Sequence, residues 1–241
     1  MNDKPKRRKR RTKEGIEELI NKAAVTLIES GGFSKLTVRN IAKEVKIEPV
    51  VFYNRYNNIE EFIDEFVKKY DYWFTGVAKT EGTVSNRDEY LHILKNLFVS
   101  LKENTVMQQL LRWEIFDNND TTRRTAGLRE FHTIPLVDRY KQVFKDAPFE
   151  IEVMSALIIG GIYYLVIHSE LTPFAGVNVN SETGHRQILN ALEFMGNYFF
   201  DNLSGLDSKT LEIARKMKEK GFENDIIEEC TKVPTSILRK L

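Results

Sequence analysis

The sequence predicts an all-α protein, with a small three-helix domain at the N-terminus and a larger helical domain after it. Apolar residues recur at helical spacing through most of the 241 residues, and no segment shows the convincing period-two alternation of a strand. Near the N-terminus, two short helical patterns flank a three-residue turn. This arrangement is typical of a helix-turn-helix, so the first domain is predicted to contain one.

The first predicted helix covers residues 14–30, and Gly31 and Gly32 end it, because glycine readily adopts the conformation that follows a helix. The second follows Thr37, whose hydroxyl can cap free backbone N–H groups. Its apolar face comprises Val38, Ile41, Ala42 and Val45. We expect this face to pack on the first helix and form a common core.

The third helix begins after the turn at residues 46–48, with Pro49 at its first position, where the missing N–H costs nothing. Phe52 and Tyr56 are four residues apart and are predicted to point inward. The outward edge then comprises Val50, Val51, Tyr53, Asn54 and Arg55. Such an edge suits insertion into a DNA major groove. A helical hairpin of an ordinary core has the same periodicity, so the pattern alone leaves both interpretations open.

Residues 14–62 resemble the N-terminal domain of the TetR family of bacterial transcriptional regulators, about the first quarter of the chain. The matching residues are Gly32-Phe33, Leu36-Thr37-Val38, Ile41-Ala42, Ile47, Phe52-Tyr53, Tyr56, Asn58 and Glu60-Glu61-Phe62. Three positions depart from the family pattern. Lys46 replaces the usual turn glycine, Glu48 replaces a Ser or Thr cap, and Ile59 replaces a lysine that often contacts phosphate.

The resemblance implies a homodimeric transcription regulator, most simply a repressor that a small-molecule effector releases from a palindromic operator. The alternative is a DNA-organising or protein-interaction module of the same fold that senses no small molecule. The expected DNA-binding residues are Thr37, Val38, Arg39, Pro49, Val50, Val51, Tyr53, Asn54 and Arg55. We predict that Asn54 and Arg55 reach base edges, and that Thr37, Arg39 and Tyr53 hold phosphates.

Charge is distributed unevenly along the chain. Residues 1–59 carry a balance of +7 and the remainder −6, although the whole chain is near neutral. The positive charge is densest in residues 4–13, which include eight Lys or Arg and no acid. We expect this arm to be disordered by itself and to contact DNA phosphates, whereas a merely solvated tail is the alternative.

The second domain is predicted to be helical throughout. One long apolar stripe covers residues 59–78, and we expect further helices near 87–103, 106–118, 122–146, 149–170 and 183–203. Pro135 should break or kink one of them. Residues 153–167 are apolar on most sides, which predicts burial against a second subunit. The resemblance also implies that the last two helices of this domain form the dimer interface.

Aromatic residues in the second domain predict an effector pocket, although ordinary cores are also aromatic. The candidate lining is Phe98, Arg112, Trp113, Glu114, Phe116, Tyr163, Tyr164 and His168. No catalytic motif is found, and the four histidines lack paired ligand spacing. We therefore expect no enzyme activity, no cofactor and no metal site. A single cysteine and no signal-type apolar segment near the basic N-terminus favour a cytoplasmic protein.

The predicted domain organisation has four parts. A basic arm covers residues 1–13, the helix-turn-helix domain 14–58, the effector-binding and dimerisation domain 59–204, and a short helical extension 205–241. The extension suggests three short helices and looks like a small helix-turn-helix-type tail. Its nearly balanced charge argues against strong DNA binding and favours a packing or dimer-stabilising role.

Overall fold

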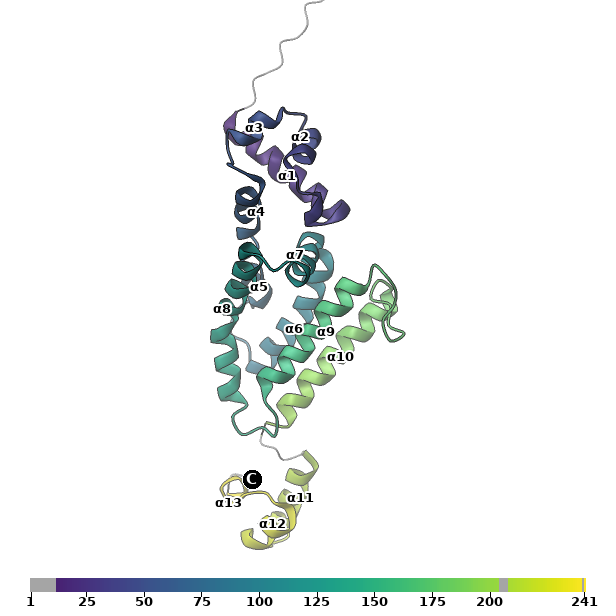
Figure 1. Ribbon diagram of the computed structural model, residues 1–241. Helices are drawn as coiled ribbons and strands as arrows, with labels where there is room; N and C mark the ends of the chain where they lie inside the picture. Colours follow the sequence, from purple (N-terminus) through teal and green to yellow (C-terminus); the bar gives the residue numbers. More distant parts are fainter. Residues whose placement is uncertain (1–11, 204–207, 240) are drawn as a thin grey trace, which may run out of the picture. The chain divides into compact units, whose positions relative to one another are not determined.

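The computed structural model describes residues 12–203, 208–239 and 241, and these residues form helices without any strand. The all-α prediction is confirmed. The described chain forms two compact units (Figure 1). Unit 1 contains the residues up to Trp73 together with Leu101–Phe131, and unit 2 contains Phe74–Ser100 and the residues from His132 onward. The boundaries of these two units differ from the predicted domain boundary between residues 58 and 59. The predicted boundary separates a DNA-binding from an effector-binding domain, and it remains a prediction.

Unit 1 begins with the predicted three-helix domain, here called the head. It consists of α1 (Lys13–Gly31), the 3₁₀ turn η1 (Phe33–Lys35), α2 (Val38–Val45) and α3 (Pro49–Tyr53). α4 (Ile59–Lys68) follows. The head core consists of apolar side chains from all its elements: Ile20, Ala23, Ala24, Ile28, Phe33, Leu36, Ile41, Ala42, Val45 and Phe52.

The rest of unit 1 comes from later in the chain. α7 (Thr105–Phe116) packs on α1 and η1, and the ring of Trp113 stacks on Phe33 with centroids 4.5 Å apart. α8 (Asp120–Val143) contributes Arg124, which donates to Asp64 at 2.9 Å and to the buried Asp71 at 2.8 Å. The three-helix head therefore forms one folded unit with a helix that begins 52 residues after α3 ends.

The predicted helix over residues 59–78 is not continuous, so this expectation was wrong. α4 ends at Lys68, and α5 (Trp73–Ala78) begins after a turn. In the turn, the N–H groups of Tyr70 and Asp71 donate to carbonyls only three residues back. The turn holds the Asp71 carboxylate against Arg124, an ion pair that no local periodicity reveals.

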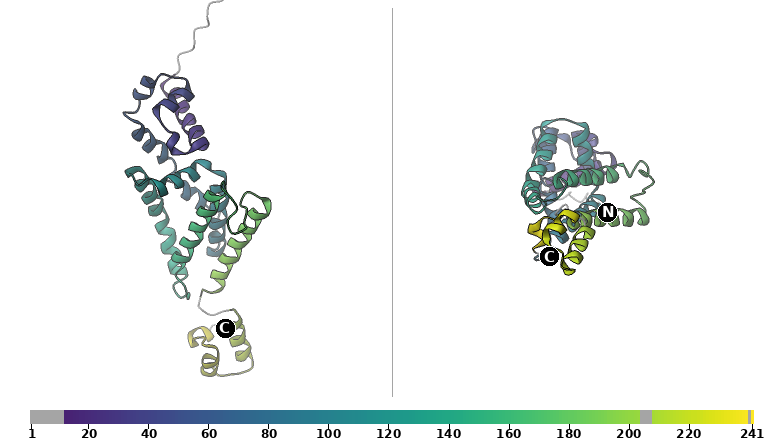
Figure 2. Two further views of the ribbon diagram at one scale, coloured as in Figure 1. Left: turned by 45° about the vertical axis from the view of Figure 1, so that its right-hand side comes forward. Right: turned by 90° about the horizontal axis from the view of Figure 1, so that it is seen from below.

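Unit 2 is built around α6 (Asn86–Glu103), α9 (Ile151–His168) and α10 (Glu182–Asp201), with the end of α8. α9 and α10 lie side by side (Figures 1 and 2). An aromatic cluster fills the core: Tyr90, Tyr140, Phe144, Phe149, Phe199 and Phe200. The helices predicted for this region are confirmed within a few residues, but α8 continues through Pro135 instead of breaking there.

α9 is much more apolar than buried. Only Ile151, Ile162 and Val166 are buried along it, whereas Leu157 is 69% exposed. By length and composition alone α9 could cross a membrane, but one such helix is weak evidence, since core helices of soluble proteins pass the same test. The exposed apolar side chains of α9 therefore form a face that a partner surface can cover.

The C-terminal helices form a small core of their own, here called the tail. α11 (Ser208–Glu219), α12 (Asn224–Thr231) and α13 (Thr235–Leu238) surround Ala214, Ile227, Val233 and Leu238. α12 and α13 repeat the geometry of α2 and α3. Each first helix has eight residues, each ends at a left-handed lysine (Lys46, φ 58°; Lys232, φ 60°), and each second helix starts three positions later.

Candidate nucleic-acid interface

The turn between α2 and α3 has the geometry of a helix-turn-helix. The hydroxyl of Thr37 accepts from the N–H of Asn40 at 3.2 Å and caps α2. At the other end the N–H of Ile47 donates to Ala42 O at 3.0 Å, while Lys46 adopts the left-handed conformation usually taken by glycine. The lysine thus forms the ordinary turn, at a conformational cost of about 1 kcal/mol.

α3 is anchored from its inner side. Phe52 is fully buried, and its ring centroid lies 5.2 Å from that of Tyr56 and 5.6 Å from that of Phe62. Burial, with nearby carboxylates, raises the pKa of Tyr56 to about 12, so the phenol stays neutral in the core. The anchored inner face fixes which side chains the helix presents outward.

The outer surface matches the sequence prediction at most positions. Val50 is 61% exposed, Tyr53 is 54% exposed, and Asn54 is exposed at the end of α3. The remaining predicted residues are also at the surface: Thr37, Arg39 and Pro49 are exposed, and Val38 and Val51 are half-buried. The predicted residues are therefore all at least partly accessible on α2 and α3.

Arg55 does not lie as predicted. Its guanidinium donates to Val51 O at 2.9 Å and to Lys13 O at 3.3 Å, and its Nε is buried without a partner in the described chain. The side chain therefore ties the end of α3 to the start of α1. A base-reading role would require these bonds to break, so base reading by Arg55 remains a prediction.

Two flanking caps hold the ends of the head. Thr12 accepts from the N–H of Gly15 at 3.1 Å and starts α1, just after the predicted basic arm. Asn58 accepts from the N–H of Glu61 at 2.8 Å and starts α4, as its spacing predicts. Glu48 is exposed and makes no side-chain cap on α3. Residues 1–11, which hold most of the arm, lie outside the described residues.

None of the eight predicted pocket residues lines the cavity that the structure describes. Arg112, Trp113, Glu114 and Phe116 belong to unit 1, whereas Phe98, Tyr163, Tyr164 and His168 belong to unit 2. Trp113 stacks on Phe33, Glu114 pairs with Arg129, and Phe116 is 85% exposed.

The predicted residues of unit 2 also have structural partners. Phe98 is fully buried, with its ring centroid 5.0 Å from that of His185. Tyr164 stacks on His168 at 5.1 Å. These rings therefore have packing partners, and the predicted pocket lining remains a prediction.

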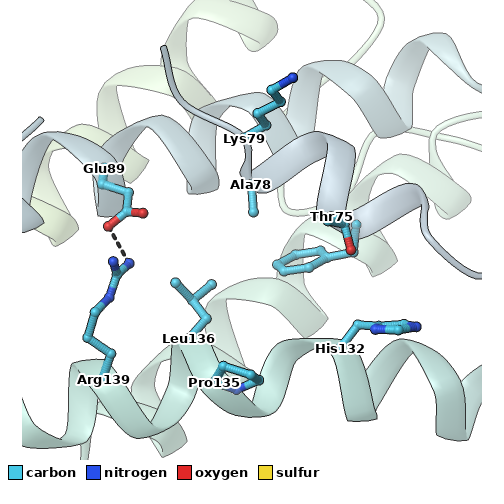
Figure 3. Close-up of a pocket in the computed structure, with 9 residues that line it drawn as sticks. Thr75, Ala78, Lys79, Glu89, His132, Pro135, Leu136 and Arg139 are labelled. Carbon is cyan, nitrogen blue, oxygen red and sulfur yellow. Dashed lines mark hydrogen bonds and ion pairs between the residues drawn. The ribbon is translucent and has the colours of Figure 1, made fainter. Parts of the chain in front are cut away.

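Unit 2 contains a cavity of about 450 Å³ at a different place. It lies between α5, α6 and α8 (Figure 3), and its lining comprises Phe74, Thr75, Ala78, Lys79, Glu89, His132, Pro135, Leu136 and Arg139. An ion pair between Glu89 and Arg139 spans one side, and Tyr140 donates its hydroxyl to Glu89 at 3.2 Å. The volume and the mainly apolar lining suit a small organic molecule.

Residues 20–66 match the family model described as bacterial regulatory proteins, tetR family. The match covers α2, the turn and α3, together with most of α1 and α4. No curated protein matches the chain in sequence.

Three solved structures show the same fold over most of the chain. A TetR-family protein from Vibrio parahaemolyticus is 16% identical, with a TM-score of 0.52, covering 73% of this chain and 96% of that one. A TetR-family regulator from Streptomyces coelicolor is 20% identical, with a TM-score of 0.53, covering 73% and 88%. The fatty acid degradation regulator FadR from Bacillus halodurans is 14% identical, with a TM-score of 0.55, covering 80% and 97%. At these identities the likeness concerns the fold.

Proposed function

Because this chain is a TetR-family transcriptional regulator, we propose that it is a homodimeric cytoplasmic repressor that leaves a palindromic operator when a small molecule occupies unit 2. The observation that carries the proposal is the anchored α3, whose buried Phe52 fixes an exposed edge containing Val50, Tyr53 and Asn54. An edge of this kind can enter a major groove.

The exposed residues suit different parts of the DNA. Asn54 carries an amide that can pair with adenine, and Val50 can contact a thymine methyl. Thr37, Arg39 and Tyr53 are exposed around this edge and suit phosphate oxygens, which position the head but carry no sequence information. Arg55 supports the edge from behind through its bonds to Lys13 O and Val51 O.

A homodimer is supported by the uncovered apolar faces of α9 and α10. Leu157 is 69% exposed and Phe194 is 70% exposed, and Tyr164 and Tyr198 are about half exposed. Large exposed apolar patches mark interaction sites. Leu192 of α10 is 3% exposed and belongs to the core of its own subunit, so it is not part of this exposed face.

The cavity of unit 2 supports a small-molecule effector. Its apolar walls come from α5 and α8, and Arg139 lines it while paired with Glu89 of α6. The structurally similar regulator from Bacillus halodurans controls fatty acid degradation. A small, largely apolar compound would suit the walls of the present cavity.

The test begins with selection of bound DNA fragments by the full-length protein, followed by a search for compounds that release the selected site. Asn54→Ala serves as the control for specific DNA reading. Leu136→Trp should fill the cavity and abolish release, whereas Ile134→Trp, exposed on the same helix, should not. Failure to select any DNA sequence would contradict the repressor. If compounds that bind the cavity leave DNA affinity unchanged, the module without an effector is the better description.

A further inference from the structure

The tail and the head share more than the turn between their last two helices. Ile41 and Phe52 of the head are fully buried eleven residues apart, and so are Ile227 and Leu238 of the tail. In both, a glycine with positive φ (Gly32 and Gly221) follows the first helix and precedes a phenylalanine. The tail is therefore a second three-helix unit of helix-turn-helix type.

The two phenylalanines differ in what covers them. Phe33 is 7% exposed because Trp113 of α7 stacks on it. Phe222 of the tail is 47% exposed and has no ring neighbour among the described residues. The same kind of apolar anchor is covered in the head and left open in the tail.

The exposed apolar side chains of the tail, together with its exposed cysteine, are here called the tail face: Ile213, Phe222, Ile226 and Cys230. Ile226 is 45% exposed, and Cys230 is exposed one turn further along α12. The N–H of Phe222 donates to Met217 O at 3.1 Å, which places it at the end of α11, beyond the turn that carries Ile213. Ile213 is itself 51% exposed.

The size of the tail favours an apolar partner for this face. Only four side chains form its fully buried core within the described part of residues 208–241. Units below about 40 residues usually need a metal, disulfides or association with another surface to be stable. Cys230 is a free cysteine, and no group of metal-ligating side chains occurs among the described residues. Association is the remaining source of stability.

DNA is not the partner that the charges favour. Where the head has Thr37, Arg39 and Lys43, the equivalent tail positions, counted from the two left-handed lysines, have Glu223, Asp225 and Glu229. Carboxylates at these positions would repel phosphates. In addition, Glu228 accepts from the N–H of Thr235 at 3.0 Å, so a carboxylate already lies at the start of α13.

The charges instead favour a second copy of the tail. α12 exposes Asp225 and Glu229. α11 and the residue after it expose more cations than carboxylates: Lys209, Arg215, Lys216 and Lys220 against Glu212 and Glu219. A two-fold contact places the same patch against itself, so α12 of one tail can face α11 of the other with attractive charges. The tail follows α10 by a few residues, and dimerisation through α9 and α10 would hold two tails at an effective concentration of the order of 1 mM.

We propose that the tail face pairs with the same face of the second subunit and forms a second dimer contact. This inference rests on the homodimer proposed above. The tail is then a clasp that raises the stability of the dimer without adding a DNA contact. Its apolar centre is Phe222 and Ile226, and its rim consists of opposite charges.

The test uses full-length protein and two variants with the same substitution at equally exposed positions. Ile226→Lys places a charge in the tail face, and Ile134→Lys places one on α8, where the isoleucine is 46% exposed. Ile226→Lys should raise the dimer dissociation constant about tenfold or more, because substitutions at the centre of an interface weaken binding most. Ile134→Lys should leave the dissociation constant unchanged. Phe222→Lys should reproduce the effect, and circular dichroism should show unchanged helicity in all three.

A second measurement uses the native thiol. A flexible bismaleimide should link the two Cys230 residues of wild-type dimers at a yield independent of protein concentration, and Ile226→Lys should remove most of this product. Wild-type protein that is monomeric at micromolar concentration contradicts the homodimer and, with it, the clasp. A dimer whose dissociation constant is the same with Ile226→Lys, or after deletion of residues 208–241, contradicts the clasp alone.

Discussion

The head and the tail place nearly the same backbone turn in two different surroundings. Both have a left-handed lysine, a buried pair eleven residues apart and a Gly-Phe pair after the first helix. They differ in the outward charges and in the cover over the phenylalanine, which only the head receives from Trp113. A few inward positions therefore set the turn, and the outward residues decide what it can bind.

The largest expected difference between head and tail concerns the salt dependence of DNA binding. Removing residues 1–11 keeps the Thr12 cap on α1 but removes seven cations of the arm. We expect at least about tenfold weaker DNA binding at low salt, and a log–log salt slope that is shallower by about 0.9 for each phosphate that the arm no longer neutralises. Removing residues 208–241 should leave this slope unchanged. Isotherms at several salt concentrations measure both, and coincident slopes for full-length and arm-deleted protein would exclude the arm from DNA binding.

The second difference concerns sequence preference. Asn54→Ala should cost roughly 1–3 kcal/mol of operator binding and relax the preference at one base pair, because alanine cannot form the bidentate hydrogen bonds to a base. Tyr53→Ala should weaken all sequences alike. Arg239, which occupies the tail position equivalent to Tyr53, should be replaceable by alanine without effect on DNA. Repeating the fragment selection with each variant checks this, and an altered preference in Arg239→Ala would give the tail a DNA-reading role.

The third comparison distinguishes recognition of DNA bases from structural stabilisation within the head. Arg55→Met removes the hydrogen bonds to Val51 O and Lys13 O, so we expect a decrease of about 1–2 kcal/mol in the free energy of unfolding. DNA affinity should fall equally for all sequences. Urea denaturation and fragment selection measure the two effects. A changed base preference with unchanged stability would show that Arg55 reads DNA directly.

The smallest effect should be the same in both motifs. Lys46→Gly and Lys232→Gly each relieve a left-handed lysine, at the cost of a more flexible unfolded chain. We expect each change to stabilise its own unit by about 0.5 kcal/mol, seen as slower hydrogen exchange in α2 or α12. Stabilisation of one motif and destabilisation of the other would show that the two turns are not equivalent.

The head was predictable because its signals are local. Thr37, Pro49 and the Asn58–Glu61 pair are capping residues within one turn of what they cap, and Phe52 and Tyr56 follow from helical spacing. Arg55 was misplaced because its partner, Lys13 O, is 42 residues away. The break after α4 was missed for the same reason, since Asp71 and Arg124 are 53 residues apart.

The cavity could not be predicted because its walls come from separate parts of the chain. Residues 74–79 of α5 and its end meet residues 132–139 of α8 there. Three of the aromatic residues that suggested a pocket take part in ring packing: Trp113 on Phe33, Phe98 against His185 and Tyr164 on His168. The apolar pattern of residues 153–167 correctly indicated a helix, whose outer side chains are exposed in the single subunit. Their burial against a second subunit remains a prediction.

The stack of Trp113 on Phe33 also limits how this DNA-binding domain can be transplanted. A chimera cut after residue 58 or even after Trp73 would carry the head without α7, and would leave Phe33 and the α1 surface bare. The smallest portable fragment is discontinuous: residues 12–73 joined by a designed linker to Leu101–Phe131. Gene fusions that exchange operator specificity should therefore be spliced at two junctions instead of one.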